Sequence, residues 1–221
     1  MGAIFNLDNP VWSFMSKVAD LVILNLLAIV CSIPIVTIGA SWTAMYFVTI
    51  RMVRKEESYI VKDFFRSFKE NFRQATIIWL FALLAIGIFA GDIIIYRMMP
   101  EQIPTALMIA VMILAYVVLG TVIYVFPLLS RYHNTIKGTV KNAFLVSVVN
   151  IPHTIVFVLL LVIPFLVSFF LIELAPFVLL FGFSLPAYVA SIFWVRIFRK
   201  FEPQEIAEDE GEPQGEGSLE E

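Results

Sequence analysis

The chain has 221 residues, of which 60% are hydrophobic and only 15% are charged. Soluble domains carry about 25% charged residues, so the composition excludes an ordinary water-soluble globular protein and indicates that lipid is the main solvent. The formal net charge of −3 reflects the C-terminus, because nine of the eighteen acidic residues follow Phe201 and the rest of the chain carries fifteen basic residues against nine acidic ones.

The basic residues are distributed in a pattern typical of a multi-pass membrane protein. Lysine and arginine are absent from four long stretches, which are residues 18–50, 74–96, 98–130 and 142–195. Between them lie three basic groups: residues 51–73, then Arg131, Lys137 and Lys141, and finally Arg196, Arg199 and Lys200. The positive-inside rule places all three groups in the cytoplasm. The sequence therefore predicts an all-α, polytopic transmembrane helical bundle with a cytoplasmic C-terminus.

The N-terminal apolar run, residues 18–50, is too long for one crossing, which needs about 20 residues. In one interpretation Asn9 caps a span over residues 10–33, and the chain then turns and returns over residues 42–54 with Ser41 as a new cap, giving six crossings. In the other, a single kinked helix crosses once, giving five. We favour six, because the Gly and Ser residues before Trp42 fit a turn better than a kink.

Residues 59–72 form the next predicted element. Their apolar side chains repeat at helical spacing while Lys and Arg occupy the opposite face. This pattern predicts an amphipathic helix lying in the plane of the membrane, with its basic side near anionic lipid. A weaker copy of the pattern over residues 138–149 predicts a second helix of the same kind. We expect both helices on the cytoplasmic side.

Four further spans follow in chain order, at about residues 75–96, 105–129, 151–172 and 176–198. Together with the N-terminal run they make residues 1–200 a single transmembrane domain. Residues 201–221 are rich in acidic residues, Pro and Gly, a composition that predicts a disordered cytoplasmic tail.

Few residues are candidates for a functional site. The basic group before the third span is a candidate partner or lipid surface, made of Arg51, Arg54, Lys55, Lys62, Arg66, Lys69 and Arg73. Two polar residues lie inside the first span: Asn25, placed to bond a neighbouring helix or to line a polar path, and Asp20, placed to pair with Lys17. The sequence offers no catalytic motif, no cofactor-binding motif and no metal-ligand spacing.

Several blocks in the first part of the chain resemble the YesL family of small integral membrane proteins, found mostly in Gram-positive bacteria. They are Asn9-Pro10, Ala19-Asp20-Leu21 to Leu24-Asn25-Leu26, Cys31-Ser32-Ile33-Pro34-Ile35-Val36-Thr37-Ile38-Gly39-Ala40-Ser41, and Met52-Val53-Arg54-Lys55-Glu56-Glu57-Ser58-Tyr59 to Asn71. The resemblance implies a genetic setting beside oligosaccharide importers of the ATP-binding-cassette (ABC) type, and it carries over no catalytic residue.

Two functions remain open at this point. The favoured one is a non-enzymatic accessory or scaffolding partner of a bacterial carbohydrate ABC importer. The alternative is a small transporter or channel that acts as a homo-oligomer, which would require a polar cavity reaching Asn25. The expected partners are membrane lipid, importer subunits and further copies of the chain; no cofactor and no nucleic acid are expected.

Overall fold

The computed structural model describes residues 10–99, 104–132 and 134–199. These residues form only helices: α1 (Pro10–Ser32), η1 (Ile35–Thr37), α2 (Ile38–Arg54), α3 (Ile60–Met98), α4 (Thr105–Arg131), α5 (Ile136–Val149), α6 (Ile151–Phe170), η2 (Ile172–Leu174), α7 (Ala175–Phe181) and α8 (Ser184–Arg199). By length and composition, five of the described helices can cross a membrane, or six if the bent pair α7 and α8 is one span. The predicted all-α, polytopic membrane fold is confirmed.

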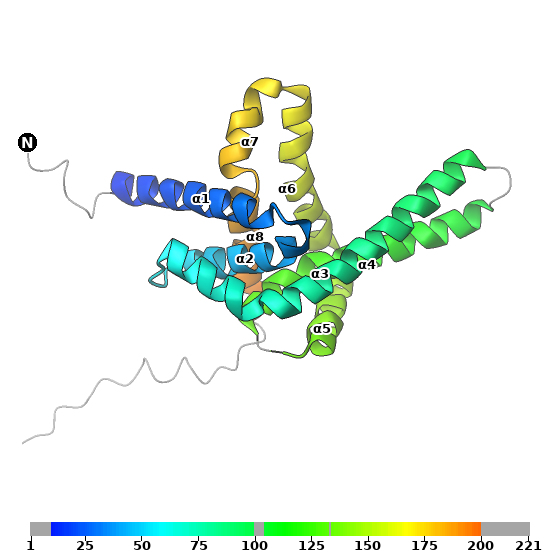
Figure 1. Cartoon of the computed structure of the whole chain (residues 1–221), viewed down its shortest axis with the longest axis horizontal. Helices are drawn as coiled ribbons and strands as arrows, with labels where there is room; N and C mark the ends of the chain where they lie inside the picture. The colour runs from blue at the N-terminus through cyan, green and yellow to red at the C-terminus, as the bar shows by residue number, and fades with distance from the viewer. Residues whose placement is uncertain (1–9, 100–103, 133, 200–221) are drawn as a thin grey trace, which may run out of the picture.

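The N-terminal run forms two helices rather than one kinked helix, and Figure 1 shows α1 and α2 running in opposite directions. The Thr37 hydroxyl stabilises the reversal by donating to the carbonyls of Cys31, at 2.6 Å, and Pro34, at 2.7 Å. The second helix begins at Ile38, so the prediction that Ser41 caps it is wrong. Because Ser41 faces α1, its hydroxyl instead donates to the Ala28 carbonyl across the hairpin, at 2.9 Å.

The predicted amphipathic helix over residues 59–72 is not a separate element, because α3 is one helix of 39 residues. No Gly or Pro interrupts residues 60–86, so nothing in the chain ends the helix before the apolar segment. At 1.5 Å per residue α3 is about 58 Å long, roughly twice the thickness of the hydrocarbon core. Figure 1 shows it changing direction along its length, so its basic first part and its apolar second part point different ways.

The predicted span over residues 176–198 is broken. Helices α7 and α8 meet at Gly182 and Phe183, with a bend of 47°. Pro186 explains the break, because it lies in the first turn of α8 and has no N–H to donate to the carbonyl four residues earlier. Whether the protein has five or six spans therefore depends on whether α7 and α8 together form one span. From the sequence, the same uncertainty between five and six was expected in the N-terminal run.

The remaining boundaries lie close to the predicted ones. Helix α4 extends two residues beyond the expected 105–129, α6 ends two residues before the end of the expected 151–172, and α5 begins two residues before the expected 138–149. Pro127 and Pro164 lie inside α4 and α6. The tail predicted over residues 201–221 lies outside the described residues.

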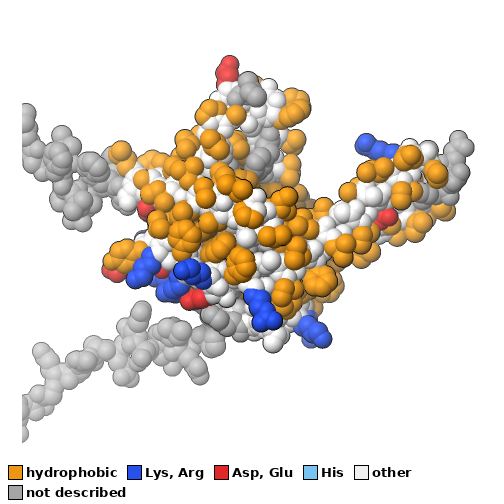
Figure 2. All heavy atoms as spheres, viewed as in Figure 1, with side chains coloured by type: hydrophobic (Ala, Val, Ile, Leu, Met, Phe, Trp, Pro, Cys, Tyr) orange, Lys and Arg blue, Asp and Glu red, His pale blue; other side chains and the backbone are white. Residues whose placement is uncertain are grey.

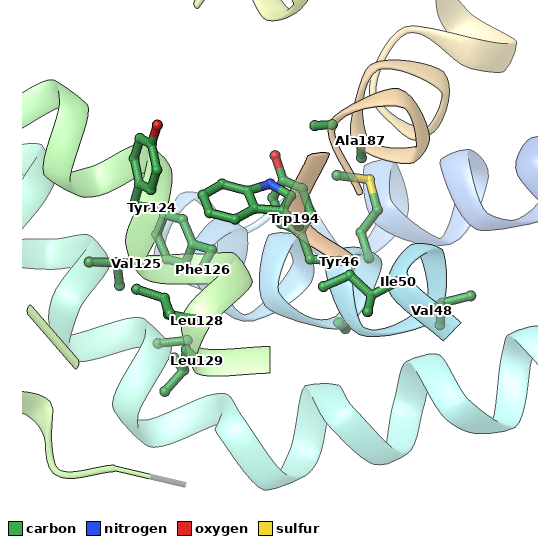
Figure 3. Packing of buried hydrophobic residues seen from close by; sticks show 14 of the residues in the cluster. Tyr46, Val48, Ile50, Tyr124, Val125, Phe126, Leu128, Leu129, Ala187 and Trp194 are labelled. Carbon is green, nitrogen blue, oxygen red and sulfur yellow. The ribbon is translucent and has the colours of Figure 1, made fainter. Parts of the chain in front are cut away.

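An aromatic cluster forms the centre of the core, where α2, α4 and α8 converge (Figure 3). The Trp194 ring lies edge-on to Tyr124, with centroids 4.8 Å apart, and stacks on Phe157 at 5.1 Å and on Phe198 at 5.6 Å. Helices α2 and α8 are also joined by a hydrogen bond of 2.8 Å between the Thr49 and Ser191 hydroxyls. Packing thus joins helices far apart in the sequence.

Helix α2 approaches α3 closely because Gly39 has no side chain. A Cβ at this position would lie 2.7 Å from the Ala75 carbonyl oxygen, 2.7 Å from the Trp79 Cβ and 3.0 Å from the Phe126 ring. Small residues at a helix contact let two membrane helices approach closely. The close contact is reinforced by the Trp79 indole, which donates to the Ile35 carbonyl at 2.7 Å.

The outer helices do not run parallel to one another. Figure 1 shows the α3–α4 hairpin and the α6–α7 hairpin extending from the core in different directions. Their surfaces are largely apolar and exposed, as at Leu84, Ile113 and Phe169, and Figure 2 shows hydrophobic side chains over most of the visible face. In the same view most of the lysine and arginine side chains gather along one side. Lipid would cover the exposed apolar surfaces in a membrane.

Candidate functional site

The basic surface comprises the seven predicted residues at the junction of α2 and α3. Five of them are exposed, namely Lys55, Lys62, Arg66, Lys69 and Arg73, and Arg51 and Arg54 are partly buried. The connection is short because Lys55 ends α2 in the left-handed conformation, with φ 58°. Its N–H and that of Glu56 donate to carbonyls of the last turn of α2, which fixes the direction in which the chain enters α3.

Arg51 and Asp63 fix the geometry of this surface. The Asp63 side chain is only 8% exposed, and its Oδ2 accepts from the Ser58 hydroxyl and the Tyr59 N–H, both at 3.1 Å. It thereby caps the N-terminus of α3, where a negative charge is favoured by the helix dipole. The same oxygen lies 3.5 Å from the Arg51 guanidinium, which also pairs with Glu56 at 3.2 Å. The carboxylate thus joins the end of α2 to the start of α3.

Aromatic contacts hold two of the arginines in place. The guanidinium of Arg51 lies 5.7 Å from the centre of the Phe47 ring, and that of Arg66 lies 5.4 Å from it, distances at which a cation is attracted to an aromatic face. Underneath, Phe64 is fully buried and stacks on Phe68. Packed side chains therefore support the part of the basic surface that Arg51 and Arg66 form.

The structure adds Arg131 to this surface. A cavity of about 250 Å³ is lined by Phe47, Arg51, Glu56, Arg66 and Arg131, together with Ile50 and Ser130. The sequence assigned Arg131 to a separate basic group, and only the packing of α4 against α2 brings it here. The other two members of that group, Lys137 and Lys141, line a different groove, between α3, α4 and α5.

Asn25 lies where α1 contacts the break between α7 and α8. It is fully buried. Its side-chain N–H donates to the Leu179 carbonyl at 2.7 Å, and its carbonyl accepts from the N–H groups of Phe183 and Ser184, both at 2.9 Å. In an unbroken helix the Phe183 N–H would bond the Leu179 carbonyl directly. The Asn25 amide is inserted between the two and satisfies both, which unpaired backbone in an apolar environment requires.

Asp20 does not form the predicted pair with Lys17. Both residues are described, Lys17 exposed and Asp20 partly buried, and the structure shows no ion pair between them. A base that precedes an acid along a helix is the less favourable order for pairing, because each charge then opposes the helix dipole.

The cavity at the centre of the helices is apolar. It has a volume of about 270 Å³ and is lined by residues of α2, α3, α4, α6 and α8, among them Trp42, Tyr46, Ile123 and Pro186. No charged residue and no Asn of the described parts of the chain lines it, so Asn25 is not part of its wall. Within the described residues no three His, Cys, Asp or Glu side chains gather closely enough to hold a metal ion.

Comparison with known proteins identifies one family for the first part of the chain. No curated protein and no solved structure matches the chain. The matching segment begins in α1 just before Asn25, includes all of α2 and the basic surface, and ends within α3. Residues 21–93 match the family described as "Protein of unknown function, DUF624".

Proposed function

We propose that this protein is a YesL-type, non-enzymatic accessory or scaffolding subunit that works beside a carbohydrate ABC importer in a bacterial plasma membrane. The observation that carries the proposal is the basic surface at the α2–α3 junction, together with its internal support from Asp63 and Phe47. The family match, over residues 21–93, covers the seven basic residues at the α2–α3 junction but not Arg131. The carbohydrate importer enters through the resemblance to the YesL family.

The charges of the basic surface favour an acidic partner. Its carboxylates are largely occupied, since Glu56 and Asp63 pair with Arg51, and Glu70 pairs with Arg66 at 3.7 Å. Four exposed cations remain without an ion pair among the described residues: Lys55, Lys62, Lys69 and Arg73. Such a patch attracts an anionic surface and speeds association with it. An acidic cytoplasmic face of an importer subunit would fit it.

Two features support an accessory role over the alternative of a homo-oligomeric transporter or channel. The amide nitrogen and oxygen of Asn25 both bond the backbone at the break between α7 and α8, and the side chain is fully buried. The central cavity is apolar, and intramembrane solute paths are marked by polar or ionisable side chains. These contacts favour a structural role for Asn25, which joins α1 to the break between α7 and α8.

Affinity purification from the native membrane tests the proposal. The wild-type chain should recover importer permease and solute-binding subunits, identified by mass spectrometry. A variant with Gln at positions 55, 62, 69 and 73 should lose at least 10-fold of that recovery, whereas Arg97→Gln, at the far end of α3, should retain it. Recovery of the chain alone, or equal recovery by both variants, would overturn the proposal. Solute flux through vesicles that contain only the purified chain would support the transporter instead.

A further inference from the structure

A second basic site lies away from the basic surface, in a groove of about 700 Å³ between α3, α4 and α5. Its walls are apolar and are supplied by residues such as Ile78 and Ala85 of α3, Val118 and Val125 of α4, and Val140 and Phe144 of α5. Among the residues that the structure describes, Lys137 and Lys141 are the charged ones that line it. The groove thus combines hydrophobic walls with two positive charges.

The two lysines belong to the face of α5 that lines the groove. They are one helical turn apart, and with Val140 and Phe144 they form a stripe at positions i, i+3, i+4 and i+7. Both are exposed, and the structure shows no ion pair for either among the described residues. Two like charges at this spacing repel each other, so an anion bound between them would reduce the electrostatic repulsion.

Helices α4, α5 and α6 supply no counter-charge for the two lysines. No Asp or Glu occurs between Glu101 and Glu173, a stretch that contains all of α4, α5 and α6. Figure 2 shows cationic side chains at the lower edge of the molecule, where α5 lies in Figure 1, and mainly hydrophobic side chains above them. The negative charge that complements Lys137 and Lys141 therefore does not come from α4, α5 or α6.

The groove has a defined shape because α5 is tied to α3. The Gln74 side chain donates to the Asn134 carbonyl at 2.8 Å, and Thr135 caps α5 by accepting from the Gly138 N–H at 3.2 Å. From Ile78 to Ala85 the α3 wall runs for about 10 Å at 1.5 Å per residue. This length suits part of an acyl chain, whereas a helix that crosses the membrane needs about 30 Å.

We propose that this groove binds one anionic phospholipid, with its phosphate between Lys137 and Lys141 and an acyl chain along the apolar walls of α3 and α4. The α3 and α4 walls belong to helices long and apolar enough to cross the membrane, so the groove is open to the acyl region of a bilayer. Basic pockets between membrane helices bind anionic lipid head groups in this way. The site is separate from the α2–α3 basic surface and does not depend on the accessory function.

Native mass spectrometry of the purified full chain tests the proposal. The protein is titrated with phosphatidylglycerol, and with phosphatidylcholine as the zwitterionic reference. The wild type should retain one phosphatidylglycerol molecule preferentially. Substituting both lysines (Lys137→Gln with Lys141→Gln) should weaken that binding about 30-fold, at about tenfold for each 1.4 kcal/mol and about 1 kcal/mol for each lysine near an anionic surface. The matched control, Lys17→Gln with Arg97→Gln, changes two exposed cations outside the groove and outside the basic surface, and should leave it unchanged.

A second pair of variants tests the apolar walls. Ala85→Trp fills the groove and should reduce lipid retention at least 10-fold, whereas Ala90→Trp, exposed on the same helix and outside the groove, should not. Val118→Trp repeats the test from α4 if the first variant fails to fold, as judged by circular dichroism and gel filtration. Equal binding of the two lipids, binding that survives loss of both lysines, or binding that survives a filled groove would each overturn the proposal. So would displacement of the lipid by millimolar inorganic phosphate, which would indicate an anion site without an acyl groove.

Discussion

The Asn25 amide is the contact on which the broken C-terminal helix pair depends most directly. We predict that Asn25→Leu, which keeps the branched shape of the side chain but removes its polar atoms, destabilises the fold. The substitution leaves the Leu179 carbonyl and the N–H groups of Phe183 and Ser184 without partners. These groups cannot pair with one another without straightening the helix, which Pro186 prevents at the next turn.

The size of the effect follows from the three hydrogen bonds, of 2.7, 2.9 and 2.9 Å. Hydrogen bonds between membrane helices contribute about 0.6 kcal/mol on average and up to about 1.7 kcal/mol each. Three of them give a predicted loss of about 2–5 kcal/mol. The loss should lie toward the upper end because Asn25 is fully buried, so water cannot replace the missing partners.

Unfolding by sodium dodecyl sulfate in mixed micelles measures this loss. Tryptophan fluorescence is a suitable signal, because the Trp42 ring lies 6.5 Å from the Phe183 ring at the break itself. The matched control is Asn142→Leu on the exposed side of α5, for which the structure shows no hydrogen bond among the described residues. This control should change the unfolding free energy by less than about 0.5 kcal/mol, as is usual for surface positions.

Two results would refute the reasoning. If Asn25→Leu unfolded at the wild-type detergent concentration, the amide would not be holding the break. If Asn142→Leu were equally destabilising, loss of any polar side chain would explain the result and the position of Asn25 would be irrelevant.

Two further predictions concern how α2 packs. Gly39→Ala should lower the unfolding free energy by about 1–3 kcal/mol, because the new Cβ would lie 2.7 Å from atoms of α3, including the Trp79 Cβ. The control is Gly87→Ala, which has open space around it. In the same unfolding titration this control should be neutral or stabilising by up to about 1 kcal/mol. Thr49→Val should lower the unfolding free energy by about 0.6–1.7 kcal/mol, because it removes the hydrogen bond to Ser191. A Thr49→Val, Ser191→Ala double-mutant cycle measures that bond, and an interaction energy of zero would contradict its assignment.

The sequence predicted the helical class and most helix positions because these depend on local signals. A membrane helix must satisfy its own backbone and be apolar over about 20 residues, so the cation-free stretches at 98–130 and 142–195 located their helices within a few residues. The basic surface was also visible, since Arg51 to Arg73 are adjacent in the chain. Local signals did not show that the amphipathic segment and the apolar segment after it form one helix. Helix α3 contains both, because no residue between them ends the helix.

The functional geometry depended on contacts between distant parts of the chain. Asn25 was recognisable as a polar residue in an apolar helix, but its partner Leu179 is 154 residues away, and only packing could identify it. In the same way the fold brings Arg131 to the basic surface and places Lys137 and Lys141 beside a groove built by α3 and α4. Hydrophobicity is a property of each segment, so the amino-acid sequence alone shows which segments are apolar enough to enter a membrane. Which polar and charged groups meet depends on how these segments pack, and is therefore visible only in the folded chain.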